Sequence, residues 1–223
     1  MNKNEFFSLL SRLKSGKLRN FVLTPQFGGF KEDVNLTNCY VFPGSFNPIT
    51  HGHYAIMKSV LKMKGERQFF FEITIDNPDK KTKPDELLYD IYKQFEKLKL
   101  CTLWDSYPLF KQKINDLQKS KIVVGTDTLI RILDLKYYKG GIAELEEFRE
   151  SMVYKSIQFI VVPRYNKTTD CVESLDYILE QVKLEDFYKD KWKSLLDELE
   201  GFRIDISSTE IREKKKENKL KIY

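Results

Sequence analysis

Two histidines lie two residues apart, directly after a loop of small residues. His51 and His53 are the only histidines of the chain, and they follow an apolar run, residues 39–42, that ends in Pro43 and Gly44. An apolar run, a tight loop and a helical pattern in this order predict a strand that leads through a loop into a helix. Loop N–H groups and the positive end of a helix attract phosphate oxygens. The stretch therefore predicts a phosphate-binding loop.

The candidate donors of this loop are the backbone N–H groups of Gly44, Ser45 and Phe46, together with the side chains of Thr50 and His53. A turn shaped by glycine and proline, with a threonine that caps the helix, produces the same pattern without any ligand. The sequence leaves both interpretations open. A metal site is not predicted, because side chains two residues apart on a helix point in different directions.

A second cluster of phosphate-binding side chains lies near the C-terminus, in the segment ISSTEIR. Ser207 and Glu210 have the spacing of a capping box, in which a serine and a glutamate close the first turn of a helix. Ser208, Thr209 and Arg212 then follow on the same turn. Hydroxyl groups and a guanidinium at a helix N-terminus hold phosphate oxygens by charge-assisted hydrogen bonds. We expect a capped helix start that also binds phosphate.

The elements that position these clusters alternate along the chain. The predicted strands cover residues 39–42, 68–75, 100–103, 121–124, 157–162 and 202–206. The predicted helices cover residues 5–13, 54–64, 85–100, 109–117, 172–182, 185–199 and 207–218. This alternation predicts an α/β fold, a Rossmann-like open parallel sheet with helices on both faces. Ligands of such sheets bind at the carboxyl ends of the strands.

The first residues do not follow the alternation. Beyond the short amphipathic helix of residues 5–13, the segment 24–35 mixes proline, paired glycines and charges, which marks a loop or linker. We predict an N-terminal appendage of unknown role, residues 1–37, followed by one domain, residues 38–223. A chain of 223 residues has the length for one such domain.

The composition, 41% hydrophobic and 32% charged, is that of an ordinary globular protein. No stretch predicts a membrane span or a cleaved leader. Cys39, Cys101 and Cys171 are odd in number and lie in apolar runs, which favours reduced core thiols over disulfides or metal ligands. We therefore expect a cytoplasmic protein without metal ligands of its own. The net charge of +5 comes partly from the basic residues 212–221, a solvated tail that does not predict nucleic-acid binding.

The two phosphate-binding clusters together resemble the signatures of the nucleotidylyltransferase superfamily. GSFNPITHGH is similar to a pattern that ends in Thr or His, any residue, Gly, His, here Thr50, His51, Gly52 and His53. ISSTEIR is similar to the second phosphate-binding signature of the same superfamily. FEITIDNPDK, GTDTLIRILDLKYY and FRIDISSTEIR resemble a branch often labelled nicotinamide-nucleotide adenylyltransferase-like. The resemblance covers about residues 38–215 and implies the nucleotidylyltransferase type of open sheet.

The resemblance implies three catalytic side chains, His53, Lys80 and Arg212. His53 donates to the α-phosphate region, whereas Lys80 and Arg212 neutralise charge. An exposed turn explains Lys80 equally well. The implied nucleotide-binding residues are Gly44, Ser45, Phe46, Thr50, Gly52, His53, Gly125, Asp127, Ser207, Ser208, Thr209 and Arg212.

Gly125 and Asp127 match the Gly, any residue, Asp triplet of adenylyltransferases, in which the aspartate contacts a ribose hydroxyl. An aspartate at a helix N-cap has the same pattern. The candidate acceptor contacts are Asn77, Trp104 and Tyr138, the last beside Tyr137. These aromatic side chains fit either a stacking role or the core.

The implied reaction transfers AMP from ATP to nicotinamide or nicotinate mononucleotide and releases pyrophosphate. Mg²⁺ would bind mainly through the nucleotide phosphates. A cytidylyltransferase that uses CTP and a pantetheine-phosphate adenylyltransferase share both signatures. One departure favours an inactive nucleotide-binding module, because the helix segment DELLYDIYKQ lacks the arginine that related enzymes carry. The implied partners are a nucleoside triphosphate and a phosphorylated small-molecule acceptor. The sequence leaves open whether the chain forms a homo-oligomer.

Overall fold

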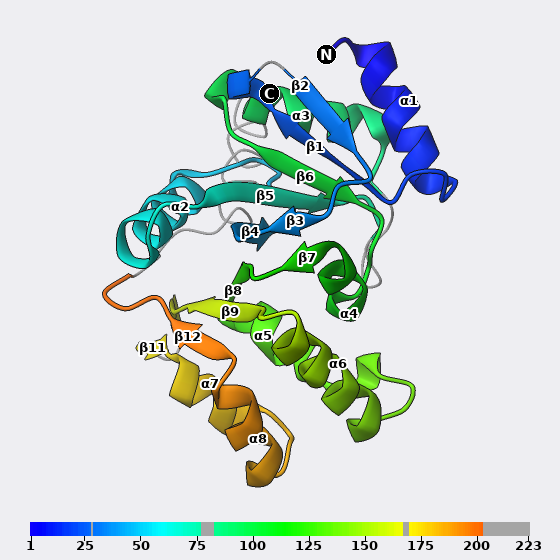
Figure 1. Cartoon of the computed structure of the whole chain (residues 1–223). Coiled ribbons are helices and arrows are strands. Elements are labelled where there is room, and N and C mark those ends of the chain that lie inside the picture. Colours follow the sequence, from blue (N-terminus) through cyan, green and yellow to red (C-terminus); the bar gives the residue numbers. More distant parts are fainter. Residues whose placement is uncertain (28, 77–82, 167–169, 203–223) are drawn as a thin grey trace, which may run out of the picture.

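The computed structural model describes residues 1–27, 29–76, 83–166 and 170–202, and one eight-stranded sheet is its central element (Figure 1). In chain order the strands of this sheet are β1 (Asn20–Thr24), β2 (Gly29–Glu32), β4 (Cys39–Pro43), β5 (Gln68–Thr74), β6 (Thr102–Asp105), β8 (Lys121–Gly125), β9 (Gln158–Val162) and β12 (Leu196–Glu198). Two small pairs lie beside it, formed by β3 (Leu36–Thr37) with β7 (Leu117–Gln118) and by β10 (Arg164–Asn166) with β11 (Cys171–Glu173).

The spatial order of the large sheet is β12-β9-β8-β4-β5-β6-β1-β2. The strands from β12 to β6 in this order run parallel to one another. β1 pairs with β6 in antiparallel orientation, and β2 pairs with β1 in antiparallel orientation. The predicted open, mostly parallel sheet is confirmed. The chain passes from β4 to β5 and β6 on one side and then returns to β8 on the other side. Ligands of open α/β sheets bind where the strand order reverses in this way.

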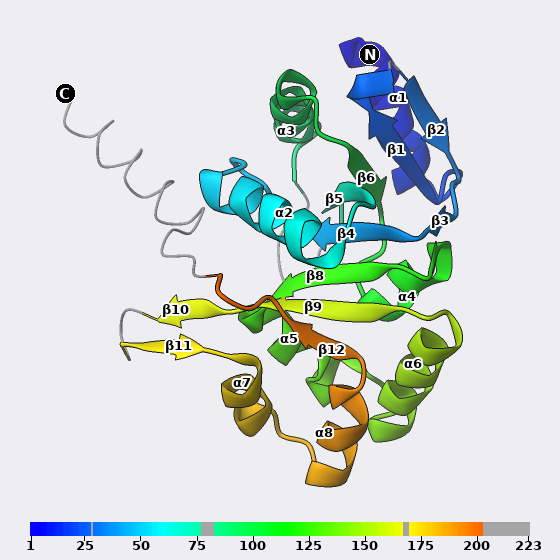
Figure 2. The same cartoon turned by 60° about the vertical axis from the view of Figure 1, so that its left-hand side comes forward.

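Helices cover both faces of the sheet, as the second view shows (Figure 2). The helices are α1 (Lys3–Lys14), α2 (His51–Lys64), α3 (Asp85–Leu98), α4 (Phe110–Lys113), α5 (Thr126–Ile132), α6 (Ile142–Tyr154), α7 (Leu175–Gln181) and α8 (Asp186–Lys193), with short 3₁₀ turns η1 (Pro25–Phe27), η2 (Ile114–Asp116) and η3 (Leu135–Tyr137). The first three helices pack on one face and the last five on the other. Among the described helices, none has the length and apolarity needed to cross a membrane.

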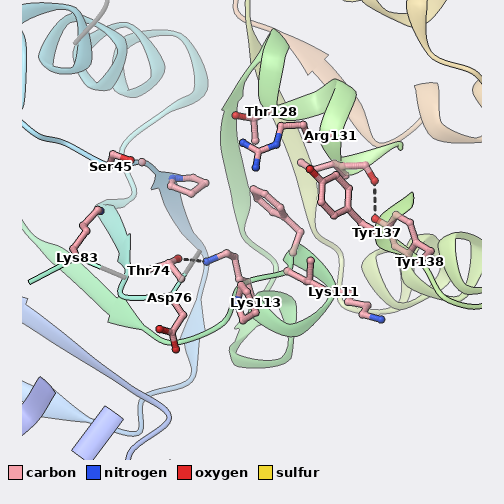
Figure 3. Close-up of a pocket in the computed structure, with 16 residues that line it drawn as sticks. Ser45, Thr74, Asp76, Lys83, Lys111, Lys113, Thr128, Arg131, Tyr137 and Tyr138 are labelled. Atoms are coloured by element: carbon pink, nitrogen blue, oxygen red, sulfur yellow. Dashed lines mark hydrogen bonds between the residues drawn. The ribbon is translucent and has the colours of Figure 1, made fainter. Parts of the chain in front are cut away.

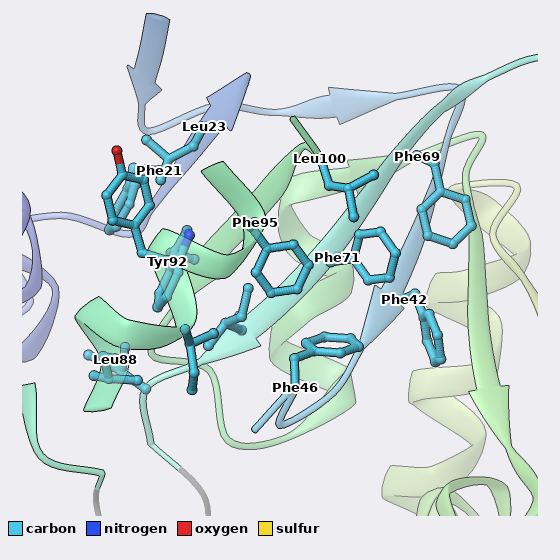
Figure 4. Close-up of a cluster of buried hydrophobic side chains, with 14 of the residues drawn as sticks. Phe21, Leu23, Phe42, Phe46, Phe69, Phe71, Leu88, Tyr92, Phe95 and Leu100 are labelled. Atoms are coloured by element: carbon cyan, nitrogen blue, oxygen red, sulfur yellow. The ribbon is translucent and has the colours of Figure 1, made fainter. Parts of the chain in front are cut away.

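Two hydrophobic cores result, one on each face of the sheet. Successive residues of a strand point to opposite faces, so Phe69 and Phe71 of β5 enter the core under α1, α2 and α3, whereas Phe70 enters the other core. In the first core, Phe46 and Phe95 contact the ring of Phe71 (Figure 4). Because both faces of the central strands are buried, these strands are continuous apolar runs in the sequence.

The N-terminal segment is part of the sheet and not a separate appendage. β1 pairs with β6 and β2 pairs with β1, so residues 20–32 extend the sheet by two antiparallel strands. The prediction of a loop at residues 24–35 is therefore wrong for Gly29–Glu32. Glycine and charged residues are tolerated there, because β2 is an edge strand with mostly exposed side chains.

Several predicted helices are shorter in the structure. The helix predicted for residues 109–117 is α4 followed by η2 and β7, and the helix predicted for 185–199 ends at Lys193 and is followed by β12. In both places a few residues with helical spacing pair as strands with distant parts of the chain. The strand predicted at 100–103 is β6, two residues later. The elements predicted at residues 203–206 and 207–218 lie outside the described residues.

Candidate active site

A cavity of about 270 Å³ opens at the carboxyl ends of the parallel strands, next to the point where the strand order reverses. Its walls come from the end of β4, the end of β5, residues 108–113, α5 and the two tyrosines after it. Figure 3 shows Ser45 and Lys83 on one side and Tyr137 and Tyr138 on the opposite side. This is the place that the topology predicts for a ligand.

Gly44 and Ser45 bring the loop after β4 to the cavity. A Cβ atom at Gly44 would lie 2.6 Å from Cζ of Phe46, so only glycine leaves room for that ring. The Gly44 N–H donates to the Glu72 carbonyl oxygen over 3.0 Å. The prediction that this N–H serves a phosphate is therefore wrong, because the sheet already uses it.

Phe46 has a structural role in the loop. Its ring is 1% exposed and packs between Phe42 and Phe71, while its backbone adopts a positive φ of 43°. The ring anchors the loop to the core and so fixes where Ser45 points. Any contact of Phe46 with a nucleotide is limited to its backbone.

His53 and Thr50 form the N-terminal cap of α2. The Thr50 N–H donates to His53 Nδ1 over 3.0 Å, and Thr50 Oγ1 accepts the His53 N–H over 3.3 Å. This is a capping box with a histidine in the place of the usual glutamate. Because Nδ1 accepts a hydrogen bond, the neutral imidazole carries its proton on Nε2. The cap therefore sets the tautomer of the histidine.

Burial keeps His53 neutral. The imidazole packs edge-on against the rings of Phe42 and Phe46, with ring centres 5.9 and 5.0 Å away. Burial lowers the pKa of His53 to about 4, because the charged form loses its hydration. At neutral pH the side chain is thus a fixed N–H donor at a helix N-terminus. Gly52 lies in the same first turn, and His51 is exposed there.

Gly125 and Asp127 also stand at a helix start. Gly125 ends β8 and is the N-cap of α5, and Asp127 lies in the first turn of that helix. The Asp127 carboxylate accepts a hydrogen bond from Arg164 Nη1 over 2.6 Å. Neither residue lines the cavity. The Asp127 side chain is 68% exposed, so this ion pair is open to solvent.

Four basic side chains and one carboxylate line the cavity. They are Lys83, Lys111, Lys113, Arg131 and Asp76. The excess of positive charge suits an anionic ligand. None of these residues was predicted as part of the site, although most of them closely follow the ends of β5, β6 and β8 in the sequence. Their position shortly after the ends of these strands is the feature of the sequence that could have identified them.

Lys113 belongs to a buried charged cluster below the cavity. Its ammonium donates to Glu72 and Thr74, and Asp105 lies 3.4 Å away. Glu72 and Asp105 are only 1% and 2% exposed. Burial and the Glu72 charge raise the pKa of Asp105 well above its ordinary value, against the opposing effect of Lys113.

The pKa of Lys113 is raised in turn. Burial alone lowers it, but the nearby carboxylates of Asp105 and Glu72 outweigh that effect. The cluster thus holds a charged lysine beside one carboxylate and one carboxyl group that retains its proton more strongly than usual.

The three aromatic candidates for ligand contacts differ in their surroundings. Tyr137 and Tyr138 line the cavity, and the Tyr138 hydroxyl donates to the Ile132 carbonyl oxygen over 2.6 Å. Trp104 is 0% exposed and lies in the core, where its ring stacks on Phe21. The prediction that Trp104 contacts an acceptor is wrong, because the sheet and α1 bury it.

Several predicted site residues lie outside the described part of the chain. These residues are Asn77, Lys80, Ser207, Ser208, Thr209 and Arg212. Within the described ranges, no group of three histidine, cysteine, aspartate or glutamate side chains is placed to hold a metal ion. Asp76 contributes a carboxylate to the lining of the cavity.

Known proteins resemble this chain in sequence pattern and in structure. Two solved structures of Plasmodium falciparum nicotinic acid mononucleotide adenylyltransferase are similar to this chain. The complex with NaAD is 13% identical with a TM-score of 0.41 and covers 78% of both chains, and the complex with APC is 12% identical with a TM-score of 0.38 and covers 77% of both. No curated protein sequence matches the chain. A family model described as cytidylyltransferase-like matches residues 41–214, and the chain therefore belongs to the cytidylyltransferase-like family of nucleotidylyltransferases.

Proposed function

We propose that this protein transfers AMP from ATP to nicotinamide or nicotinate mononucleotide and releases pyrophosphate. The observation that carries the proposal is the pair formed by Thr50 and His53 at the start of α2. It fixes a neutral imidazole with its proton on Nε2, directly after the loop that reaches the cavity. Family membership supports the transfer of a nucleotidyl group.

The reaction needs alignment and charge neutralisation more than a base. The attacking phosphate of the acceptor is already ionised at neutral pH, so no side chain has to remove a proton. It attacks the α-phosphorus of ATP, the bond to the bridging oxygen breaks, and pyrophosphate leaves. Charge grows on the α-phosphate oxygens during this step. In the proposal, His53 Nε2–H donates to one of these oxygens, and the N-terminus of α2 stabilises the same charge.

Basic side chains of the cavity are available for the charge neutralisation that the reaction needs. α3 carries no arginine, as its sequence indicates, but Arg131 of α5 and Lys83 before α3 both line the cavity. Their charges are suited to neutralise the triphosphate, which argues against an inactive module. Lys80, Ser208, Thr209 and Arg212 stay assigned to the phosphates by resemblance alone. Mg²⁺, when bound to the triphosphate, would shield part of its charge, with Asp76 as a candidate ligand.

The acceptor is assigned to the side of the cavity opposite Ser45. Tyr137 and Tyr138 lie on this side (Figure 3), and Phe110 also lines the cavity, so the lining is partly aromatic, which suits the planar ring of a pyridine mononucleotide. Asp127 does not line the cavity, so its contact with a ribose hydroxyl stays assigned by resemblance alone. Because Asp127 is paired with Arg164, this contact would have to compete with that ion pair.

The proposal is tested by following pyrophosphate release from the full chain with Mg²⁺. ATP and CTP are each paired with nicotinamide mononucleotide, nicotinate mononucleotide, phosphopantetheine and a phosphorylated choline-type acceptor. Release with ATP and a pyridine mononucleotide is the expected result. Release with CTP alone would assign a cytidylyltransferase, and release with phosphopantetheine alone would assign the other adenylyltransferase. Tight ATP binding without release from any pair would make the protein a nucleotide-binding module.

A further inference from the structure

One wall of the cavity is a short segment with little regular structure of its own. We call residues 107–116 the wall segment; it contains α4 and η2 and contributes Pro108, Leu109, Phe110, Lys111 and Lys113 to the lining. A helix of four residues, followed by a 3₁₀ turn, is too short to be stable alone. Its position must therefore come from contacts with the rest of the protein, which include the packing of Phe110 on Phe159 and the burial of Ile114 as well as contacts nearer its ends.

The first end of the wall segment is held by the sheet. The Tyr107 N–H donates to Asp105 Oδ1 over 3.1 Å, and Lys113 reaches back to Glu72 and Asp105. These partners lie on β5 and β6, so they tie the segment to the strands next to the cavity. All of them lie within the range that the family model matches.

The second end is held by the N-terminal segment, through Asp116. Its side chain is 6% exposed, and both of its oxygens are taken. Arg19 Nη1 donates to Oδ1 and Asn20 Nδ2 donates to Oδ2, each over 2.7 Å. Asn20 is itself 1% exposed. A buried carboxylate held by two donors in this way is a rigid anchor.

Asn20 is in turn fixed on its other side. Its Nδ2 also donates to the Val34 carbonyl oxygen over 3.0 Å, and its Oδ1 accepts the Val34 N–H over 2.9 Å. Arg19 donates to the Asp33 carbonyl oxygen as well. Arg19 and Asn20 thus stand at the start of β1 and are themselves bonded to the turn that leads from β2 to β3. They precede residue 41, where the match to the family model begins.

We propose that Arg19 and Asn20 are positioning residues for the acceptor side of the cavity. Through Asp116 they hold the wall segment in place, so the N-terminal segment sets the affinity for the acceptor. In the proposal, the ATP side of the cavity, which is lined by the ends of β4 and β5 and by Lys83, does not depend on this anchor. The identity of the acceptor rests on the proposed function, whereas the anchor itself does not.

The test compares variants of the full chain in two measurements. Arg19→Met removes one donor to Asp116, Arg19→Lys keeps a cation there, and Asn20→Asp places a second carboxylate beside Asp116. Arg12→Met is the matched control, because Arg12 pairs with Glu32 within the same N-terminal segment at 2.6 Å and away from the wall segment. The measurements are amide hydrogen exchange of residues 107–116 and steady-state kinetics for ATP and the acceptor.

We expect Arg19→Met to speed exchange of the wall segment and to raise the KM for the acceptor, each about tenfold, which is the effect of one lost charged hydrogen bond. The KM for ATP and kcat should stay within about twofold. Arg19→Lys should return the exchange rate and the acceptor KM most of the way to their wild-type values. Asn20→Asp should change both quantities more than Arg19→Met does, and Arg12→Met should change neither.

Two results would overturn the inference. Exchange of residues 107–116 in Arg19→Met at the wild-type rate would show that the anchor does not hold the wall segment. Faster exchange with an unchanged acceptor KM would show that the segment does not position the acceptor. If the wild-type protein turns over no acceptor at all, the proposed function fails, but the exchange measurement still decides whether the anchor exists.

Discussion

At the start of α2, His53 has a structural task, and the proposed function gives it a chemical one. His53 closes the capping box with Thr50, which satisfies two backbone donors of the first helical turn. The same hydrogen bond leaves the proton on Nε2, and burial prevents a second proton from binding at neutral pH. A turn that is capped for stability thereby presents a donor in one defined tautomer. The structural interpretation of this motif describes the helix cap, and the proposed function adds a chemical role for the same side chain.

His53→Ala should lower the rate of pyrophosphate release by at least about 100-fold, as expected for the loss of one donor to transition-state charge. The free energy of unfolding should fall by only about 1 kcal/mol, the value of a helix cap. His51→Ala is the control, because His51 is exposed in the same helical turn. It should leave both quantities unchanged.

The pH dependence of stability gives this prediction a second measurement. In the unfolded chain His53 takes up a proton near pH 6.5, and in the folded chain only near pH 4. Acidification from pH 6.5 to 4 should therefore destabilise the wild type by up to about 3 kcal/mol through this residue, and His53→Ala should lack that part of the loss. Wild-type turnover in His53→Ala would remove the residue from the mechanism.

At the scale of elements, buried charges connect α4 to the sheet. β5 and β6 bring Glu72 and Asp105 to the same face, and the Lys113 side chain fills the space above them. Removing one partner from such a group leaves an uncompensated buried charge, which costs more than the loss of a surface ion pair. Because the cluster lies directly below the cavity, it also fixes one part of the cavity floor.

Lys113→Met should lower the free energy of unfolding by about 3–5 kcal/mol in denaturant titrations at pH 7, since Glu72 stays buried without its counterion. Lys193→Met is the control, because Lys193 is 54% exposed and pairs with Asp190 on the surface. This control should change stability by less than about 0.5 kcal/mol. Equal effects of the two substitutions would contradict the interpretation of the cluster.

Asp105→Asn should be tolerated far better than Lys113→Met, because an amide resembles the protonated carboxyl that burial favours at this position. The raised pKa of Asp105 means that the folded state keeps this proton while the unfolded state loses it near pH 4. Its contribution to stability is complete below that pH and declines as the pH rises. The stability of Asp105→Asn relative to the wild type should therefore increase with pH above 4, and a decrease would refute the assignment.

At the scale of the whole molecule, the N-terminal segment and the family-matched region share one core. The ring of Phe6 in α1 stacks on Tyr92 of α3 and meets Trp104 of β6 edge-on, with ring centres 5.0 and 5.1 Å away. α1 therefore covers the part of the sheet that β1 and β2 extend. Two cores on opposite faces of one sheet cannot separate without breaking the sheet, so we expect cooperative unfolding.

Phe6→Ala should lower the free energy of unfolding by about 3–5 kcal/mol, as for other large core truncations. Near-UV and far-UV circular dichroism should still report one coincident transition. Phe7→Ala is the control, because Phe7 is only partly buried at the rim of the same core and should cost less than half as much. Two separate transitions, with the first one confined to residues 1–37, would restore the view of an independent appendage.

The local pattern of the chain was sufficient for the strands and helices of the parallel part. β4, β5, β8 and β9 are apolar runs buried on both faces, and such runs are recognisable without tertiary information. The capped start of α2 was equally legible, since Thr50 is a typical N-cap residue. The elements that were not predicted include the 13-residue helix α6, which packs on the sheet through Leu145, Phe148 and Met152, as well as short or peripheral strands. β2 and β12 were not predicted, because their pairing partners lie far away in the sequence.

By itself, the sequence determined the open α/β sheet and the loop that leads into α2, and it indicated the residue types expected to meet phosphate, because periodicity and capping are local properties. Only the tertiary structure decided which side chains share the cavity. It placed Arg131 and Lys113 there, buried Trp104 in the core and used the Gly44 N–H within the sheet. The physical reason is that a hydrogen bond or a buried charge depends on partners that approach from other strands and helices, and no local pattern records that approach.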